Sequence, residues 1–275
     1  MPSPLLSLDT PVVIAHRGGA GLRPENTMTA FEHAVSLGVD AVECDVHLSR
    51  DGEVVVIHDD TLDRTTDARG PVSALTAAEL ARVDAGAAFV DASGRAPWRG
   101  AGIGVPRLVD LLDRFADLPV VIELKGEDPG IVAPVLDLIA RTGSERRVVI
   151  GGFSHAVLGA VRAAAPGIVT SASSREARAA LRRSWCWLAP RRTGCRLFQL
   201  PLRLRGRSIL TPRLVRCARR AGLPVQVWVV DAPGEMRMLL DWGVTGIITD
   251  RPDIAMTVVP RGRAGRAAPP HPAPA

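Results

Sequence analysis

The chain has 275 residues and a mass of 29.2 kDa; 47% of its residues are apolar and 23% are charged. This composition excludes an intrinsically disordered protein, and no apolar run approaches the roughly 20 residues needed to span a bilayer. The first ten residues contain neither a basic segment nor a long apolar one, so we expect no secretory signal and a cytoplasmic location. The cysteines form no CxxC pair and are interpreted as reduced packing residues: Cys44, Cys186, Cys195 and Cys217.

The net charge of +5 and the isoelectric point near 9.8 come from one stretch of the chain. Residues 175–220 hold fourteen arginines and a single acid, Glu176, whereas residues 1–174 carry a net charge of −8. Few aromatic residues are interleaved, so we interpret the stretch as a solvated arginine-rich face and expect no nucleic-acid partner. The less favoured alternative is a binding surface for nucleic acid or, through Arg175–Arg220, peripheral contact with an anionic membrane.

Short β-branched runs alternate with amphipathic stretches along the chain, which is typical of strand–helix units around a parallel sheet. The expected strands are Val12–Ala15, Ala41–Val46, Val54–His58, Val120–Leu124, Val148–Gly152, Ile168–Ser171, Leu197–Leu200, Val225–Val230 and Gly246–Thr249. The expected helices are Thr27–Leu37, Arg107–Ala116, Ile131–Arg141, His155–Ala164, Glu176–Arg183, Pro212–Ala221 and Gly234–Asp241. These nine strands are one more than an eight-fold barrel needs.

The surplus strand is Val54–His58. It follows the previous strand too closely for a parallel crossover, which needs a dozen or more residues, and Asp51-Gly52 is a strong hairpin signal. We therefore predict that it folds back antiparallel. His58 then lies opposite Asp45 if the loop has two residues, or opposite Glu43 if the loop has four.

Eight strand–helix units remain, and eight is the number that closes a barrel. The expected fold class is α/β: a (β/α)8 TIM barrel with a β-hairpin extension and a small insertion after the second strand, in one domain over residues 1–260. Residues 59–105 are too long for a plain loop and contain a helical piece at Thr76–Val83, so we predict an inserted lid. The Pro/Ala/Arg-rich residues 261–275 are predicted to form a disordered tail.

Acidic residues fall where the predicted strands end, which is where the active sites of this fold lie. Glu43 and Asp45 are two residues apart and share a face of one strand, as do Glu123 and Lys125 on the next. Three carboxylates inside a barrel need compensation, and their oxygen atoms favour Mg²⁺ or Ca²⁺. The alternative is a salt-bridge layer in which Arg17 and Lys125 neutralise the acids.

Two histidines flank the same predicted mouth. His16 follows the first strand and His58 ends the hairpin, so we interpret them as a general acid–base pair rather than as packed core histidines. Arg17 and Lys125, the one lysine of the chain, suggest clamps for a phosphate oxyanion. Trp228, with Phe153, would form an apolar wall for the substrate, or else ordinary barrel packing.

These residues lie in a series of motifs: HRG at 16–18, PENT at 24–27, ECDVHLSRDGEVVVIHDDTLDRTT at 43–66, IELK at 122–125 and GIITDRP at 246–252. In this order, and over about residues 11–255, the chain resembles the glycerophosphodiester phosphodiesterases of the PLC-like TIM-barrel superfamily. The resemblance implies Glu43, Asp45 and Glu123 as metal ligands, His16 and His58 as the acid–base pair, Arg17 and Lys125 as phosphate contacts, and Asn26 as a further polar residue of the substrate site.

The resemblance implies metal-dependent hydrolysis of small glycerophosphodiesters to sn-glycerol 3-phosphate and an alcohol. The alternative is a phospholipase D-like member that acts on lysophospholipids or sphingolipids on the same barrel. Ser49 and Thr245 depart from the commoner residues, away from the expected ligands. Residues 173–207 match the family poorly and follow the fifth and sixth strands, where selectivity is often built, so the leaving alcohol stays open.

Overall fold

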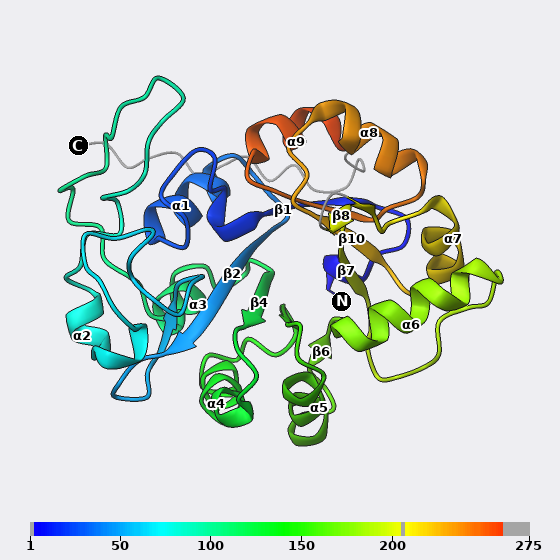
Figure 1. Cartoon of the computed structure of the whole chain (residues 1–275), viewed down its shortest axis with the longest axis horizontal. Helices are drawn as coiled ribbons and strands as arrows, with labels where there is room; N and C mark the ends of the chain where they lie inside the picture. Colours follow the sequence, from blue (N-terminus) through cyan, green and yellow to red (C-terminus); the bar gives the residue numbers. More distant parts are fainter. Residues whose placement is uncertain (1–2, 205–206, 261–275) are drawn as a thin grey trace.

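A computed structural model describes residues 3–204 and 207–260, and its parallel strands form a (β/α)8 barrel surrounded by helices (Figure 1). The parallel strands are β1 (Val12–Ala15), β2 (Ala41–Leu48), β4 (Val120–Leu124), β5 (Val148–Gly151), β6 (Val169–Thr170), β7 (Phe198–Pro201), β10 (Val225–Trp228) and β11 (Gly246–Thr249). They are ordered β6-β5-β4-β2-β1-β11-β10-β7. The ring closes between β6 and β7 through a parallel bridge that pairs Ser171 with Leu197. The predicted fold class is confirmed.

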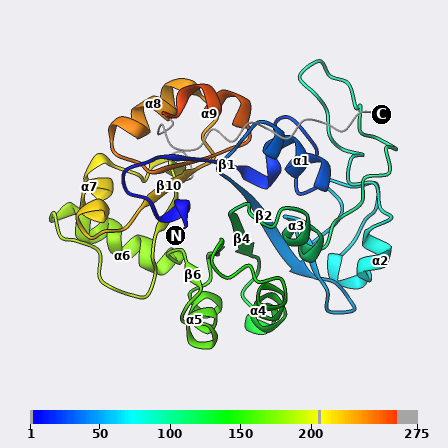
Figure 2. The same ribbon diagram turned by 180° about the vertical axis from the view of Figure 1, so that it is seen from behind.

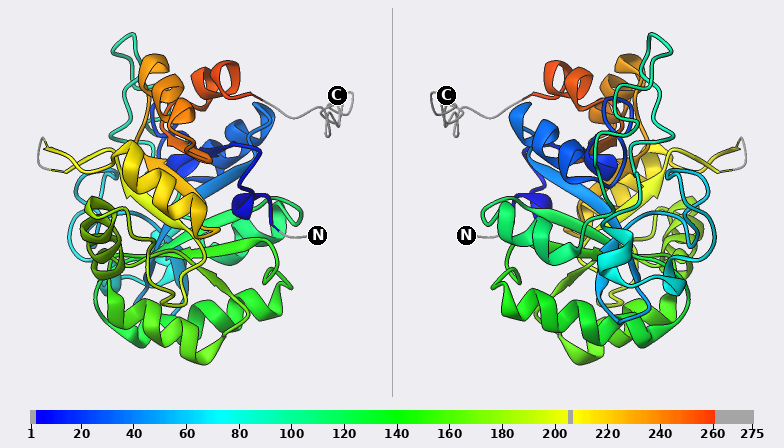
Figure 3. Two further views of the ribbon diagram at one scale, coloured as in Figure 1. Left: turned by 90° about the vertical axis from the view of Figure 1, so that its right-hand side faces the viewer. Right: turned by 90° about the vertical axis from the view of Figure 1, so that its left-hand side faces the viewer.

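The helices lie outside the strands, and Figure 3 shows α4 and α5 (green) on the opposite side of the barrel from α8 and α9 (orange and red). They are α1 (Met28–Ser36), α3 (Leu108–Arg114), α4 (Val132–Arg141), α5 (His155–Ala164), α6 (Ser174–Trp185), α7 (Pro212–Arg220), α8 (Pro233–Asp241) and α9 (Pro252–Val258). Side-chain oxygens of Thr27, Ser154, Ser173 and Thr211 cap four of them. Sequence reasoning missed α9, a short helix that begins at Pro252.

The hairpin forms, but in neither predicted register. β3 (Val54–Val56) is antiparallel to β2, with Val56 opposite Val46. The loop has three residues, 50–52, because Ser49 and Glu53 pair and Gly52 adopts φ +80°. A glycine in this left-handed conformation is typical of three-residue hairpin loops. Continued pairing would place His58 opposite Cys44 on the helix-facing side, but β3 ends at Val56 and the chain bends.

Residues 59–105 form a small unit packed on the outer face of the hairpin (Figure 1). It contains a 3-10 turn, Val72–Ala74, and one short helix, α2 (Ala77–Leu80). The predicted capping box between Thr76 and Glu79 is present, but α2 ends three residues before the predicted Val83. The unit has its own core, in which Val55 and Ile57 of the hairpin pack against Leu62 and Leu80. Its role as a lid stays a prediction.

Two further hydrophobic cores stabilise the barrel. One lies inside the strands, where Leu5 from the turn Pro4–Leu6 packs against Ile14 and Val121. Figure 2 shows this N-terminal turn, in dark blue, near the centre of the ring. The larger core fills the space between strands and helices. No helix in residues 3–204 and 207–260 has the length and hydropathy needed to cross a membrane. The tail predicted for 261–275 lies outside the described residues.

Candidate active site

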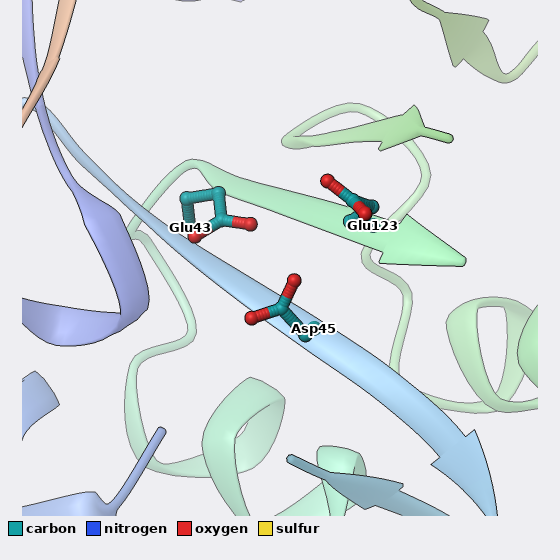
Figure 4. A group of neighbouring side chains, drawn as sticks. All are labelled: Glu43, Asp45 and Glu123. Atoms are coloured by element: carbon teal, nitrogen blue, oxygen red, sulfur yellow. The ribbon is translucent and has the colours of Figure 1, made fainter. Parts of the chain in front are cut away.

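Three carboxylates lie together inside the mouth of the barrel. Glu43 and Asp45 point to the same side of β2, and Glu123 on β4 is the register partner of Asp45. One oxygen from each side chain lies within 4.8 Å of the others. Figure 4 shows the three side chains directed toward one another from the two adjacent strands. The structure thus brings together the three residues that the sequence suggested as metal ligands.

Glu43 and Asp45 differ in how their charges are compensated. Glu43 is 5% exposed, and its Oε2 accepts a hydrogen bond from the backbone N–H of Arg17 at 2.9 Å. Burial and the neighbouring Asp45 charge raise the pKa of Glu43 to about 8. Asp45 faces Lys125 Nζ at 2.7 Å and Arg17 Nε at 3.2 Å. Burial alone would raise the pKa of Asp45, but these two cations outweigh it and hold that pKa below its usual value.

The donor set fits a hard divalent cation. Its atoms are carboxylate oxygens, which suit Mg²⁺ or Ca²⁺ better than zinc. Two cationic side chains, Arg17 and Lys125, face three acids, and Arg17 also pairs with Glu25 at 2.8 Å. The negative charge of the three acids therefore exceeds the positive charge of Arg17 and Lys125. The cluster could bind a metal, which would supply the missing positive charge.

Lys125 lies between two of the three acids. Its Nζ is 2.7 Å from Asp45 Oδ1 and 2.5 Å from Glu123 Oε1. Burial lowers the pKa of Lys125, but the two carboxylates outweigh it and raise that pKa above its usual value. These are the contacts that the salt-bridge interpretation predicts. The site therefore contains an ion-pair layer as well as a carboxylate cluster whose charge is not balanced.

The turn after β1 positions His16 and Arg17. Gly18 adopts φ +81°, and a Cβ there would lie 2.7 Å from the Cβ of Ala30, so a glycine is required. The His16 Nδ1–H donates to Asp250 Oδ1 at 2.7 Å, while Nε2 lies 4.0 Å from Glu43 Oε2. Burial lowers the pKa of His16, but Asp250 and Glu43 outweigh it and raise that pKa.

His58 is oriented in the same way from the hairpin side. Its Nδ1–H donates to Asp59 Oδ1 at 2.6 Å, and its backbone oxygen accepts from His47 Nε2 at 3.0 Å. Arg64 holds Asp59 in turn, and these partners keep the pKa of Asp59 well below its usual range. In both histidines Nδ1 is engaged by a carboxylate, so Nε2 is the nitrogen available for proton transfer.

Both histidines and the carboxylate cluster line one cavity of about 390 Å³. Phe153 and Trp228 also line it and pack edge to face, with ring centroids 5.9 Å apart and an interplanar angle of 83°. Further walls come from α6, β7 and α7 and are largely apolar. The cavity therefore joins a polar part, where charged groups converge, to an apolar part.

Asn26 contacts Asp45. It is 3% exposed, its Nδ2 donates to Asp45 Oδ2 at 2.9 Å, and its Oδ1 accepts from the Asp45 N–H at 3.3 Å. Its φ of 56° lies in the left-handed region, where asparagine is enriched among residues other than glycine. Asn26 therefore orients one of the three acids.

Sequence reasoning did not assign the carboxylates that hold the histidines. Asp59 follows His58 directly, and Asp250 directly follows β11, the last barrel strand, within the GIITDRP motif. Their positions directly after predicted strands could have marked both as candidate active-site residues. Only the closed barrel brings Asp250 against His16, because β11 is the neighbour of β1.

The fold and the site define a class: a TIM-barrel enzyme whose mouth combines a carboxylate cluster, two oriented histidines and cations suited to a phosphate ester. Residues 16–254 match the model of the Glycerophosphoryl diester phosphodiesterase family. The chain belongs to this family and is a phosphodiesterase enzyme.

Relatives of known name are similar in sequence to this chain over about nine-tenths of its length. A glycerophosphodiester phosphodiesterase of Caldanaerobacter subterraneus subsp. tengcongensis is 31% identical over 262 residues, covering 91% of this chain and 98% of the relative. A probable glycerophosphodiester phosphodiesterase 2 of Mycobacterium tuberculosis is 34% identical over 256 residues, covering 90% of each chain.

Solved structures share the fold. The crystal structure of a glycerophosphodiester phosphodiesterase from Agrobacterium tumefaciens has a TM-score of 0.73 and 29% identity, covering 90% of this chain and 100% of its own. A phosphodiesterase from Oleispira antarctica, solved in complex with the product sn-glycerol-3-phosphate, has a TM-score of 0.73 at 23% identity, covering 91% and 97%. At that identity the second likeness concerns the fold alone.

Proposed function

We propose that this enzyme hydrolyses glycerophosphodiesters to sn-glycerol 3-phosphate and an alcohol, with a divalent metal as cofactor. The observation that carries the proposal is the convergence of the carboxylate cluster, His16 and His58 on one cavity. The Oleispira antarctica phosphodiesterase of the same fold, in complex with sn-glycerol-3-phosphate, supports this choice of product.

Glu43, Asp45 and Glu123 would hold the metal, which when bound polarises the phosphoryl group and offsets its developing charge. Asn26 would orient Asp45 through the two hydrogen bonds between them. Mg²⁺ and Ca²⁺ both suit the oxygen donors.

The two histidines would move the protons. One Nε2 accepts the proton of the attacking oxygen, which is water or the substrate's own glycerol hydroxyl. The attacking oxygen forms a bond to phosphorus while the bond between phosphorus and the alcohol oxygen breaks, and the other Nε2–H donates its proton to the departing alkoxide. Attack by water gives glycerol 3-phosphate directly; attack by the glycerol hydroxyl gives a cyclic phosphate, which a water molecule then opens to glycerol 3-phosphate with the two histidines exchanging roles. Asp250 and Asp59 would accept from the Nδ1–H of His16 and of His58, which leaves each Nε2 for this exchange.

Arg17 and Lys125 would contact the non-bridging phosphate oxygens. Both already lie at the cluster, and both are cationic, so an approaching phosphodiester would share them with Asp45 and Glu123. Trp228, paired with Phe153, would pack against the carbon skeleton of the substrate at the junction of the polar and apolar parts.

The test is release of glycerol 3-phosphate from a panel of glycerophosphodiesters, measured with and without a chelator. We expect turnover that chelation abolishes and that added Mg²⁺ or Ca²⁺ restores. Turnover that survives complete metal removal would overturn the metal assignment. Release of no glycerol 3-phosphate from any member in the presence of metal would overturn the function.

A further inference from the structure

We propose that the apolar part of the cavity is a subsite for a single hydrocarbon chain of the substrate, so that the enzyme prefers phosphodiesters that carry an alkyl or acyl chain. This rests on the proposed function, because the phosphodiester itself must bind at the carboxylate cluster. We call this subsite the apolar arm and define it by six lining residues: Ala177, Leu181, Leu200, Leu204, Ile209 and Leu214.

One wall of the apolar arm is the inner face of α6. Ala177 and Leu181 are four residues apart, so they lie above one another on the same side of the helix. Both are only partly buried, although α6 packs against α7. The first turn of α6 is anchored by Arg162, which binds Glu176 beside Ala177. The wall is therefore a fixed apolar surface.

Another wall comes from β7, from Leu204 and Ile209, and from the start of α7. Leu200 and Leu214 are buried there, whereas Leu204 is 56% exposed. Phe153, at the junction with the polar part, is 50% exposed. Exposed apolar side chains that line a cavity continuous with reactive groups are the signature of a ligand surface.

The lining of the arm offers little to a polar or cationic alcohol. In the described part of the chain, the acids that line the cavity are the three of the cluster, and the charged residue contributed by α6 is Arg178. The side-chain Nε2 of Gln199 is already hydrogen bonded to Gln226 Oε1 at 2.9 Å. A cationic alcohol such as choline would meet no carboxylate in the arm and would be repelled by Arg178.

The chain could be attached to either side of the phosphate. On the alcohol side it would leave with the alcohol, as in a glycerophospho-n-alkanol. On the glycerol side it would stay with the phosphate, as in a lysophosphatidylcholine. The chemistry recognised by the arm is the same, since burial of each methylene away from water is favourable by a similar amount.

The experiment measures kcat/KM for two substrate series below their micelle concentrations. The first runs from glycerophosphoethanol to glycerophospho-octanol, and the second consists of short-chain lysophosphatidylcholines. In at least one series kcat/KM should rise by up to about fourfold per methylene until the arm is filled. The series that rises identifies the side that carries the chain.

Substitutions in the apolar arm test whether the rise of kcat/KM with chain length depends on this subsite. Leu204→Ser should lower kcat/KM on the octanol ester or its lysophosphatidylcholine counterpart by about tenfold, flattening the chain-length slope. Ala177→Leu narrows the apolar arm, so kcat/KM should stop rising at a shorter substrate chain length than in the wild type. Leu188→Ser is the matched control, because Leu188 is 49% exposed but does not line the cavity, and it should keep the wild-type slope.

Two results would overturn the proposal while leaving the proposed function intact. One is turnover of glycerophosphoethanol with no gain from longer chains in either series. The other is preference for glycerophosphocholine over every chain-bearing substrate, which would mean that Phe153 and Trp228 bind a quaternary ammonium instead. Absence of turnover of all substrates, short ones included, would instead count against the proposed function.

Discussion

The buried pair between Arg162 and Glu176 allows a quantitative test of how α6 is held beside the cavity. Arg162 donates to Glu176 through both terminal nitrogens, at 2.7 and 3.1 Å, and Ser173 adds its backbone N–H at 2.8 Å. The Glu176 side chain is 4% exposed. Burial alone would raise the pKa of Glu176, but these donors outweigh it and lower that pKa to about 2.

The perturbation is Glu176→Gln, which keeps the shape of the side chain but cannot ionise. The folded-state pKa is depressed, so the charged carboxylate stabilises the fold fully above its ordinary pKa of 4.5 and loses this effect as the pH falls toward 2. The lowered pKa of Glu176 corresponds to a stabilisation of about 3 kcal/mol at neutral pH and of about 1 kcal/mol at pH 3.

The assay is urea unfolding of the wild type and of Glu176→Gln from pH 7 to pH 3. The difference between their unfolding free energies should shrink by about 2 kcal/mol over this range, because only the wild type loses a charge at this position. Glu32→Gln is the control: the Glu32–Arg114 pair is exposed, and its loss should cost at most about 1 kcal/mol. A difference that stays constant with pH, or grows as the pH falls, would refute the reasoning.

Further predictions concern the site itself. His16→Ala and His58→Ala should each lower kcat by at least about 10²-fold while the far-UV circular dichroism spectrum is retained, and near-normal turnover in either variant would contradict its role. Asp250→Asn should lower kcat by about tenfold or more with little change in KM, because the amide can favour the wrong tautomer of His16; an unchanged kcat would argue against the positioning role. Glu43→Gln should raise the Mg²⁺ or Ca²⁺ concentration needed for half-maximal activity by at least about tenfold, and an unchanged metal titration would exclude Glu43 as a ligand.

The hairpin of β2 and β3 was predicted correctly from the sequence, but its loop length was not. Asp51-Gly52 indicated a turn, and β3 is indeed antiparallel to β2. The predicted two- and four-residue loops were both wrong, because Gly52 takes the left-handed conformation and closes a three-residue loop. Since strand faces alternate residue by residue, this change decides which side each hairpin residue faces.

The interval of two residues on a strand was enough to determine that Glu43 and Asp45 share a face, and the strand count was enough to determine an eight-fold barrel. These are local properties of the chain, set by backbone geometry. The contact of Asp250 with His16, across 234 positions, and the apolar arm between α6 and α7 depend on ring closure and helix packing. The tertiary structure alone decided them, because they join residues whose separation along the chain carries no periodic signal.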